Sequence, residues 1–162
     1  MPKTQSKPLD GARGKRADPT WQAQDILSRR DHSEAEVRGK LRRKGFTPDQ
    51  IDMAIRWLQE KRLLNDAAFA RRYIAAVLSA KAVGRRWLKH KLQEKGIAAS
   101  IQEEALNAAL APEQETALAE RAAAAWQRAH SQHASDRQRL VRHLLSRGFS
   151  WETISRALSA LQ

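Results

Sequence analysis

The sequence predicts an all-α protein of three tandem three-helix repeats, stacked in an elongated array. Helical apolar patterning begins near Trp21 and barely stops afterwards, and no strand-like alternation is convincing. Glycine (7) and proline (5) are scarce, so helices can run with few breaks. A helix-ending pattern recurs three times at a spacing of about 50 residues, which indicates an internal repeat.

The repeated pattern centres on Gly45, Gly96 and Gly148. Each glycine has apolar residues eight and four positions before it, a Lys or Arg just before it and an apolar residue just after it. Apolar residues four apart lie on one helical face. A glycine placed here takes the left-handed conformation that ends a helix, and the preceding cation suits the negative end of the helix dipole. We therefore expect one helix to end and another to begin at each glycine.

Three further helices are expected at about residues 21–30, 66–80 and 113–130, one before each glycine-ended helix. Capping boxes mark where two of the glycine-ended helices begin. Ser33 with Glu36 begins the one in the first repeat, and Ser135 with Gln138 begins the one in the third. Each repeat then has a first, a middle and a last helix.

The last helices begin directly after the glycines. Thr47 is an N-cap followed by Pro48 at the first helical position, and Ser150 is a second N-cap. The first buried residues of the last helices are expected to be Ile51, Ile101 and Ile154. We predict a disordered basic tail at 1–18 and three-helix units at 19–64, 65–110 and 111–162. A unit of about 50 residues is marginal alone, so stacking should complete the cores.

The charge of the chain predicts a polyanionic partner. There are 30 Lys and Arg against 18 Asp and Glu, a net charge of +12 at pH 7. Such a balance suits nucleic acid, an acidic protein or anionic lipid, and a merely solvated basic surface is the alternative. The absence of cysteine excludes disulfides and thiolate sites, and it fits a cytoplasmic protein. No apolar run approaches the ~18 residues of a membrane span, and no secretory signal is visible.

The densest basic block, 81–95, holds six Lys or Arg residues and one acid. Its cations lie beside an apolar helical stripe, and Trp87 lies well off that stripe. Such a strip could hold phosphates while the ring stacks on a base. Alternatively, Trp87 packs against a neighbouring unit and the cations are solvated. The candidate partner-binding residues are Arg85, Arg86 and Lys89, followed by Arg71, Arg72, Arg38 and Arg42.

No catalytic, cofactor or metal site is predicted. The sequence lacks a glycine-rich phosphate loop and the HExxH and GxSxG motifs. His130 and His133 are three apart, but no further ligand lies nearby in sequence to complete a metal site. Four other aromatic residues are expected to be core anchors and not ligand contacts: Trp57, Phe69, Tyr73 and Trp126.

Four segments of the chain carry a further signal. They run Arg30-Asp31-His32-Ser33-Glu34-Ala35-Glu36-Val37-Arg38-Gly39-Lys40-Leu41, Leu63-Leu64-Asn65-Asp66-Ala67-Ala68-Phe69-Ala70-Arg71-Arg72-Tyr73, Leu92-Gln93-Glu94-Lys95-Gly96-Ile97, and Arg147-Gly148-Phe149 through Ile154. These segments resemble the signatures of the RecX family, bacterial regulators of the RecA recombinase. Together they cover about residues 20–161 in the family's order. The sequence departs from the family pattern at Ala82, usually glycine, at Trp87, commonly arginine, and at Lys91, commonly glutamate.

The resemblance implies a curved helical protein that lies in the groove of a RecA filament on single-stranded DNA. It further implies inhibition of filament growth, ATP hydrolysis and strand exchange, together with roles in DNA repair, recombination and the SOS response. We expect weak non-specific DNA binding, no membrane contact and a monomer. Two alternatives stay open: a sequence-specific DNA-binding protein, because the Gly45-Phe46-Thr47 connection resembles a helix-turn-helix joint, and an RNA-binding or ribosome-associated protein.

Overall fold

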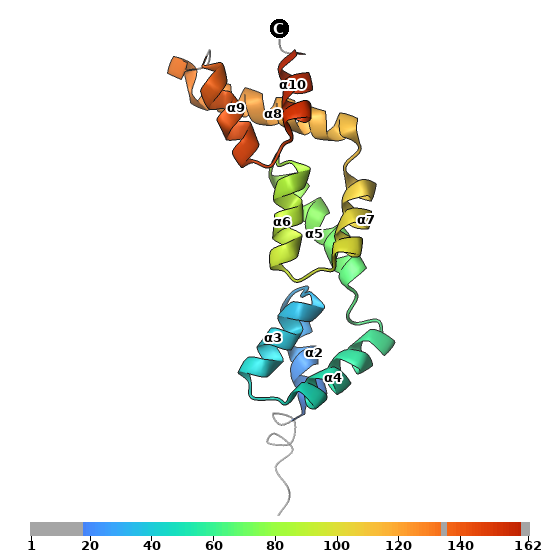
Figure 1. The fold of residues 1–162 in the computed structure, drawn as a ribbon. Helices are drawn as coiled ribbons and strands as arrows, with labels where there is room; N and C mark the ends of the chain where they lie inside the picture. The colour runs from blue at the N-terminus through green and yellow to red at the C-terminus, as the bar shows by residue number, and fades with distance from the viewer. Residues whose placement is uncertain (1–17, 134–135, 160–162) are drawn as a thin grey trace, which may run out of the picture. The chain divides into compact units, whose positions relative to one another are not determined.

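The computed structural model of the chain describes residues 18–133 and 136–159 (Figure 1). Within these residues there are nine α-helices, one short 3-10 helix and no strand, which confirms the all-α prediction for this part of the chain. The predicted basic tail lies, except for Asp18, outside the described residues. The chain divides into two compact units, one ending at Asn65 and one beginning at Asp66.

The first unit is a single three-helix group. Its helices are α2 (Pro19–Arg29), α3 (Glu34–Arg43) and α4 (Pro48–Glu60). Helix α2 packs against both α3 and α4, and α3 also packs against α4. The buried apolar residues come from all three helices and the segment after α4: Ala23, Ile26, Val37, Leu41, Ile51, Ala54, Ile55, Leu58 and Leu64.

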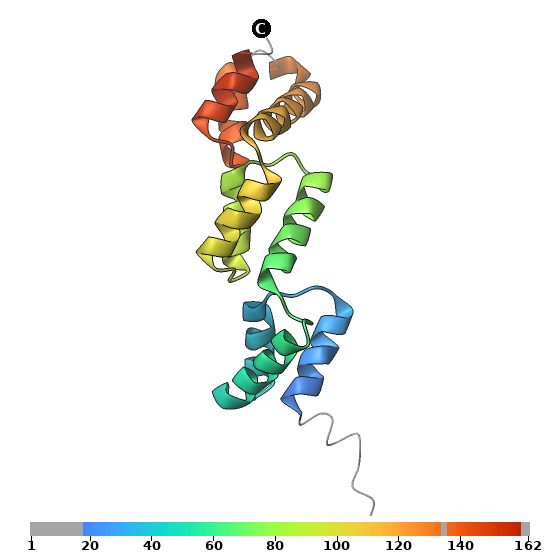
Figure 2. The ribbon, with the colours of Figure 1, turned by 90° about the vertical axis from the view of Figure 1, so that its right-hand side faces the viewer.

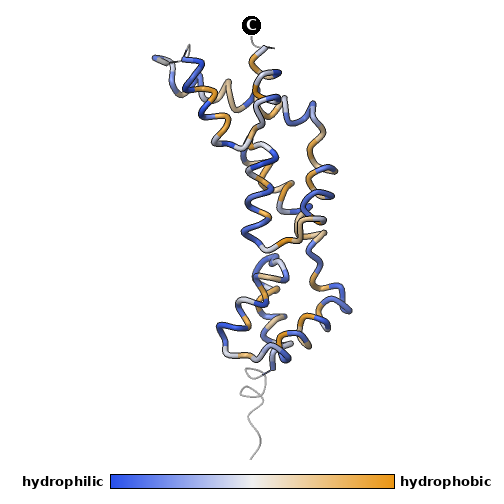
Figure 3. Tube along the Cα trace, in the orientation of Figure 1, coloured by the Kyte–Doolittle hydropathy of each residue, from blue (hydrophilic) through white to orange (hydrophobic). Residues whose placement is uncertain are grey.

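The second unit contains two three-helix groups. The helices are α5 (Asp66–Ala80), α6 (Arg85–Glu94), α7 (Ala99–Ala109), α8 (Pro112–Ala129), η1 (Ser131–His133), α9 (Arg137–Ser146) and α10 (Trp151–Ser159). Helix α7 packs against α5 and α6, and α8 packs against α9 and α10 (Figure 2). One continuous apolar cluster runs from Phe69 to Leu158, so the two groups share a core. Figure 3 shows apolar and polar residues alternating along the helices that contribute to it.

The three repeat glycines end their helices as predicted. Gly45, Gly96 and Gly148 have φ values of 88°, 71° and 82°. At each one, the residue after the glycine donates its backbone N–H to a carbonyl five residues back, for example Phe149 to Leu144 at 3.3 Å. The glycine itself donates to a carbonyl three residues back. This is the paired hydrogen-bond pattern that satisfies the last carbonyls of a helix.

The helix starts follow the predicted caps with one change. The capping boxes of Ser33 and Thr47 are both formed, and the Ser150 hydroxyl accepts from the Thr153 amide at 3.1 Å. Helix α9, however, is capped by Asp136, whose carboxylate accepts from a first-turn amide at 3.0 Å. The prediction of Ser135 as its N-cap is therefore wrong, and Ser135 itself lies outside the described residues.

The expected first buried residues are confirmed in two of three cases. Ile51 and Ile154 are 3% and 1% exposed. Ile101 is only partly buried, and its neighbour Gln102 is buried instead. The Gln102 side chain donates to the carbonyl of Ile97 at 2.7 Å, which satisfies the buried amide group.

Candidate functional site

The predicted basic strip on α6 is partly neutralised by α7. The Arg85 guanidinium lies 2.7 Å from the Glu103 carboxylate and 2.6 Å from the side-chain oxygen of Asn107. Lys89 donates to the other carboxylate oxygen of Glu103. The hydrogen bonds from Lys89 and Arg85 hold the pKa of Glu103 below its usual range. Arg86 is exposed and makes no ion pair within the part of the chain that the structure describes.

The other predicted contact residues lie in both units. In the first unit, Arg38 binds Glu34 at 2.7 Å and Asp52 at 2.5 Å, and the Asp52 hydrogen bond is the main reason that the pKa of Arg38 is raised. Arg42 is exposed on the same helix. Arg71 and Arg72 are exposed on α5 in the second unit. The structure therefore brings Arg85 and Lys89 together but does not gather the seven residues into one site within either unit.

Trp87 is packed rather than fully exposed. Its side chain is partly buried against the apolar cluster of the second unit. The Lys81 and Lys91 ammonium groups lie 5.8 and 5.7 Å from the centre of its ring. Both distances are within the range of a cation–π contact. The alternative in which Trp87 packs against a neighbouring three-helix group is the one that the structure supports.

Trp87 packs where the N-terminal end of α6 lies against the C-terminal end of α9. The Gly84 amide donates to the Arg147 carbonyl at 2.9 Å, and the Arg86 amide donates to the Gly148 carbonyl at 3.1 Å. A Cβ atom on Gly84 would lie 2.4 Å from the Gly148 oxygen, so only glycine fits there without a backbone shift. The positive start of one helix thus meets the negative end of another, which is electrostatically favourable.

A side chain from α8 completes this junction. Gly84 has no side chain to cap α6, and the Glu115 carboxylate instead accepts from the Arg85 amide at 2.8 Å. The Arg147 guanidinium donates to the Ala82 carbonyl at 3.2 Å. The second and third three-helix groups are therefore joined by backbone and side-chain hydrogen bonds as well as by their shared core.

Beside the junction lies an open groove of about 790 Å³, which we call the basic groove. Its walls come from α8, α9 and the α5–α6 connection, and Trp87 and Trp126 also line it. No Asp or Glu is among its described lining residues. Its ionisable side chains are all basic: Lys81, Arg121, Arg128, His130, His143 and Arg147.

Two histidines and an arginine interact inside the basic groove. Arg147 Nε donates to His143 Nε2 at 3.2 Å, which requires a neutral His143. The pKa of His143 is lowered mainly by burial, and to a smaller extent by the nearby Arg147 and His130. The His130 ring stacks on Trp126 with ring centres 4.8 Å apart. The charge of Arg147 thus disfavours protonation of His143, and no carboxylate among the described lining residues offsets it.

The basic groove was not predicted from the sequence, although the spacing of two of its arginines was visible there. Arg121 and Arg128 are seven residues apart in an alanine-rich helix, a spacing that places them on one face. The other lining residues come from segments distant in the sequence, and no local pattern connects them.

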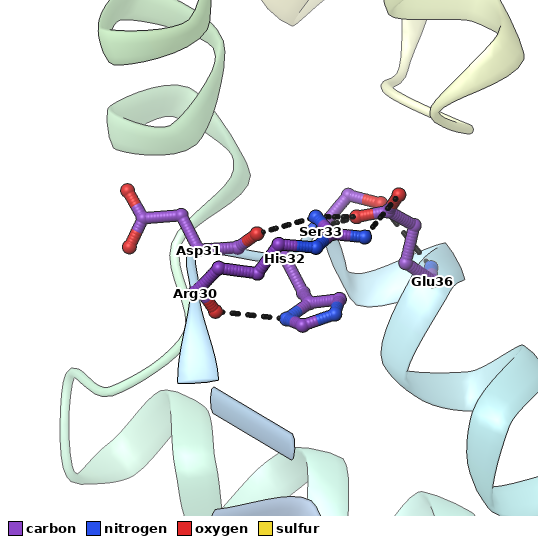
Figure 4. A network of polar contacts seen from close by, with 5 residues as sticks. All are labelled: Arg30, Asp31, His32, Ser33 and Glu36. Atoms are coloured by element: carbon purple, nitrogen blue, oxygen red, sulfur yellow. Dashed lines mark hydrogen bonds and ion pairs between the residues drawn. The ribbon is translucent and has the colours of Figure 1, made fainter. Parts of the chain in front are cut away.

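The Arg30–Glu36 segment builds a turn (Figure 4). His32 is 3% exposed, and its Nδ1 lies 2.8 Å from the Arg30 carbonyl oxygen. Because a carbonyl only accepts, Nδ1 carries the proton, and burial lowers the pKa of His32. Ser33 and Glu36 form the α3 capping box, and Arg30 binds Glu36 at 3.4 Å. These contacts organise the turn between α2 and α3.

Two expectations about other sites can be set against the described residues. Within 18–133 and 136–159 there is no group of three or more His, Cys, Asp or Glu residues placed to hold a metal ion. No helix in the same ranges is long and apolar enough to cross a membrane.

Comparison with known proteins gives the family. Residues 22–58 match the model of the RecX first three-helix domain, residues 65–106 the second and residues 113–158 the third. The chain belongs to the RecX family. This confirms the resemblance and the three-helix repeats. Because RecX proteins are regulators, membership also supports the prediction that the chain is not an enzyme.

Individual relatives align with the chain along most of their length. The chain is 34% identical over 139 residues to the regulatory protein RecX of Prosthecochloris aestuarii, covering 83% of this chain and 87% of that one. It is 33% identical over 141 residues to the regulatory protein RecX of Chlorobaculum tepidum, covering 87% and 86%. The crystal structure of RecX from Lactobacillus salivarius has the same fold, with a TM-score of 0.82 at 24% identity over 92% of this chain and 97% of that one.

Proposed function

We propose that the chain regulates the RecA recombinase by binding the groove of the RecA filament on single-stranded DNA, where it limits filament growth, ATP hydrolysis and strand exchange. The observation that carries this proposal is the match of all three RecX domains, in order, along the chain. The net charge of +12 supports a nucleoprotein partner. The protein acts in the cytoplasm as a monomer, and its own DNA affinity is weak and independent of sequence.

The test is the DNA-dependent ATPase activity of RecA on single-stranded DNA. Substoichiometric amounts of the chain should suppress ATP hydrolysis and strand exchange. Unchanged rates of both across a range of salt concentrations would refute the proposal. Salt-titrated binding to duplex DNA addresses the alternative function, because a groove-reading regulator would prefer one duplex sequence by orders of magnitude.

We further propose that Arg85, Arg86 and Lys89 contact the filament. Arg86 can bind a partner without breaking an ion pair, whereas a partner must compete with Glu103 for Arg85 and Lys89. Reversal of all three charges should weaken inhibition while helicity stays normal. Arg137→Glu, a single exposed charge reversal on α9, is a control for charge reversal outside the predicted contact and should leave inhibition intact.

A second variant distinguishes the cations that are paired with Glu103 from Arg86, which is not paired with it. Glu103→Gln removes the competing charge, so inhibition should strengthen if Arg85 and Lys89 contact the partner. If neither the triple reversal nor Glu103→Gln alters inhibition, the contact lies elsewhere, with Arg71 and Arg72 or Arg38 and Arg42 as the next candidates.

A further inference from the structure

The cations of the basic groove differ from those of the α6 strip in their partners. Arg85 and Lys89 share Glu103, whereas Lys81, Arg121 and Arg128 make no ion pair within the described residues. Among the residues that the structure describes, the Arg147 side chain donates to His143 and to the Ala82 carbonyl and to no carboxylate. A concave site lined by charge of one sign attracts anions more strongly than the same charge spread over an open face.

The apolar part of the groove lining, which we call the alanine floor, is made mostly of small side chains. Several alanines of α8 and the α5–α6 connection line it, together with the buried Val83: Ala80, Ala82, Ala122, Ala124, Ala125 and Ala129. Small residues allow another backbone to approach closely. A floor of this kind accepts aliphatic side chains and offers them few polar groups.

The aromatic rings in the basic groove are already covered. Trp126 is 8% exposed and stacks on His130, and Trp87 is partly buried with two lysine ammonium groups against its ring. Nucleic-acid grooves bind single strands through open aromatic faces on which bases stack. The ring environment therefore favours a polypeptide over a nucleic-acid strand.

We propose that the basic groove binds an acidic amphipathic helix of a partner protein, with aliphatic side chains on the alanine floor and carboxylates against the arginines and Lys81. Such a helix presents apolar residues on one face and charges beside them, which matches the floor and rim of the groove. This inference goes beyond the proposed function, because it is argued from the groove lining alone and does not depend on which protein carries the helix.

The probe is a fluorescein-labelled synthetic helix of about 18 residues with leucine and alanine on one face and glutamate on the other. Its affinity for the full chain is measured by fluorescence anisotropy. In the groove variant Arg121→Glu/Arg128→Glu, the dissociation constant should rise by about tenfold or more, since two attractive charges become repulsive. The control Arg137→Glu/Arg142→Glu makes the same change in net charge on exposed residues outside the groove and should stay within about twofold of wild type.

A second readout reports the groove directly. Carboxylates bound beside His143 should raise its pKa towards and above the usual 6.5, which NMR titration of the imidazole detects in the full chain. Circular dichroism checks that the groove variant is folded. If it is not, Arg121→Gln/Arg128→Gln replaces it, with a smaller loss of affinity expected.

Three results would overturn the proposal. The first is equal affinity of the groove and control variants for the peptide. The second is binding of an all-glutamate peptide of the same charge as tightly as the amphipathic one, which would leave the alanine floor without a role. The third is tighter binding of oligothymidylate than of the peptide, dependent on the same two arginines, which would make the groove a nucleic-acid site. RecA ATPase assays on the groove variant report on the proposed function separately, because loss of peptide binding with intact inhibition leaves that function standing.

Discussion

Gly148→Ala should destabilise the second compact unit far more than a conformational penalty alone would. Gly148 has a φ of 82°, and the left-handed conformation costs an alanine about 1 kcal/mol. The added Cβ would also lie 2.3 Å from the Trp87 amide nitrogen and 2.9 Å from its Cα, which are backbone atoms that cannot rotate away. Relief of this overlap requires α6 and the α9–α10 turn to separate.

The cost of that separation follows from the contacts at the junction. The hydrogen bonds Gly84 to Arg147 and Arg86 to Gly148 would break or lengthen, at about 1 kcal/mol each. Displacement of the partly buried Trp87 adds about 1 kcal/mol more by comparison with other overpacked sites. The total is about 4 kcal/mol of unfolding free energy for the second unit.

Gly45→Ala is the matched control. Gly45 ends α3 with a φ of 88°, but a Cβ there meets nothing within 4 Å. It should cost only about 1 kcal/mol. Hydrogen exchange measured on peptides from each unit separates the two effects, and the amides of Gly84 and Arg86 should exchange at least about thirtyfold faster in Gly148→Ala. Equal costs for the two substitutions would refute the close-approach reasoning.

Three smaller effects are expected. Glu115→Ala removes the side-chain cap of α6 and should lower the unfolding free energy by about 1 kcal/mol in urea denaturation, whereas Glu113→Ala on the same turn should change little; equal losses would contradict the capping role. Burial lowers the pKa of both His32 and His143 from the usual 6.5, so the unfolded chain binds protons more readily. Stability should therefore hold above about pH 6.5 and fall as the pH drops below it, and denaturation curves that do not change between neutral and mildly acidic pH would exclude this linkage. Ser33→Ala removes a capping box and should cost about 1 kcal/mol, with faster hydrogen exchange confined to the first unit; a change in the second unit instead would be inconsistent with it.

The ends of the helices were predictable because the interactions that set them are local. A C-terminal glycine, its preceding cation and the apolar residue after it lie within a few residues of the carbonyls that they satisfy. The start of α9 was misplaced by one residue because Ser135 and Asp136 are adjacent and both are good N-caps. Ile101 was expected to be buried from its place in the repeat, but the burial of Gln102 depends on a hydrogen bond to a loop carbonyl.

The candidate site was only half predictable. The cations of the 81–95 block are evident from composition, and their exposed positions follow from helical periodicity. Whether a cation is neutralised depends on residues far away in the chain. Glu103 on the next helix forms ion pairs with Arg85 and Lys89 but not with Arg86.

The sequence by itself determined that this protein is helical, that three similar units follow one another, and that it belongs among the RecX regulators, because helix caps, periodicity and family signatures are carried by short segments. Only the tertiary structure decided that the second and third groups share one core and that Gly84 and Gly148 meet at their junction. It also decided that Lys81, Arg121 and Arg128, which make no ion pair within the described residues, line one groove beside α8, α9 and the α5–α6 connection. These features depend on packing between segments about 60 residues apart, for which local sequence carries no signal.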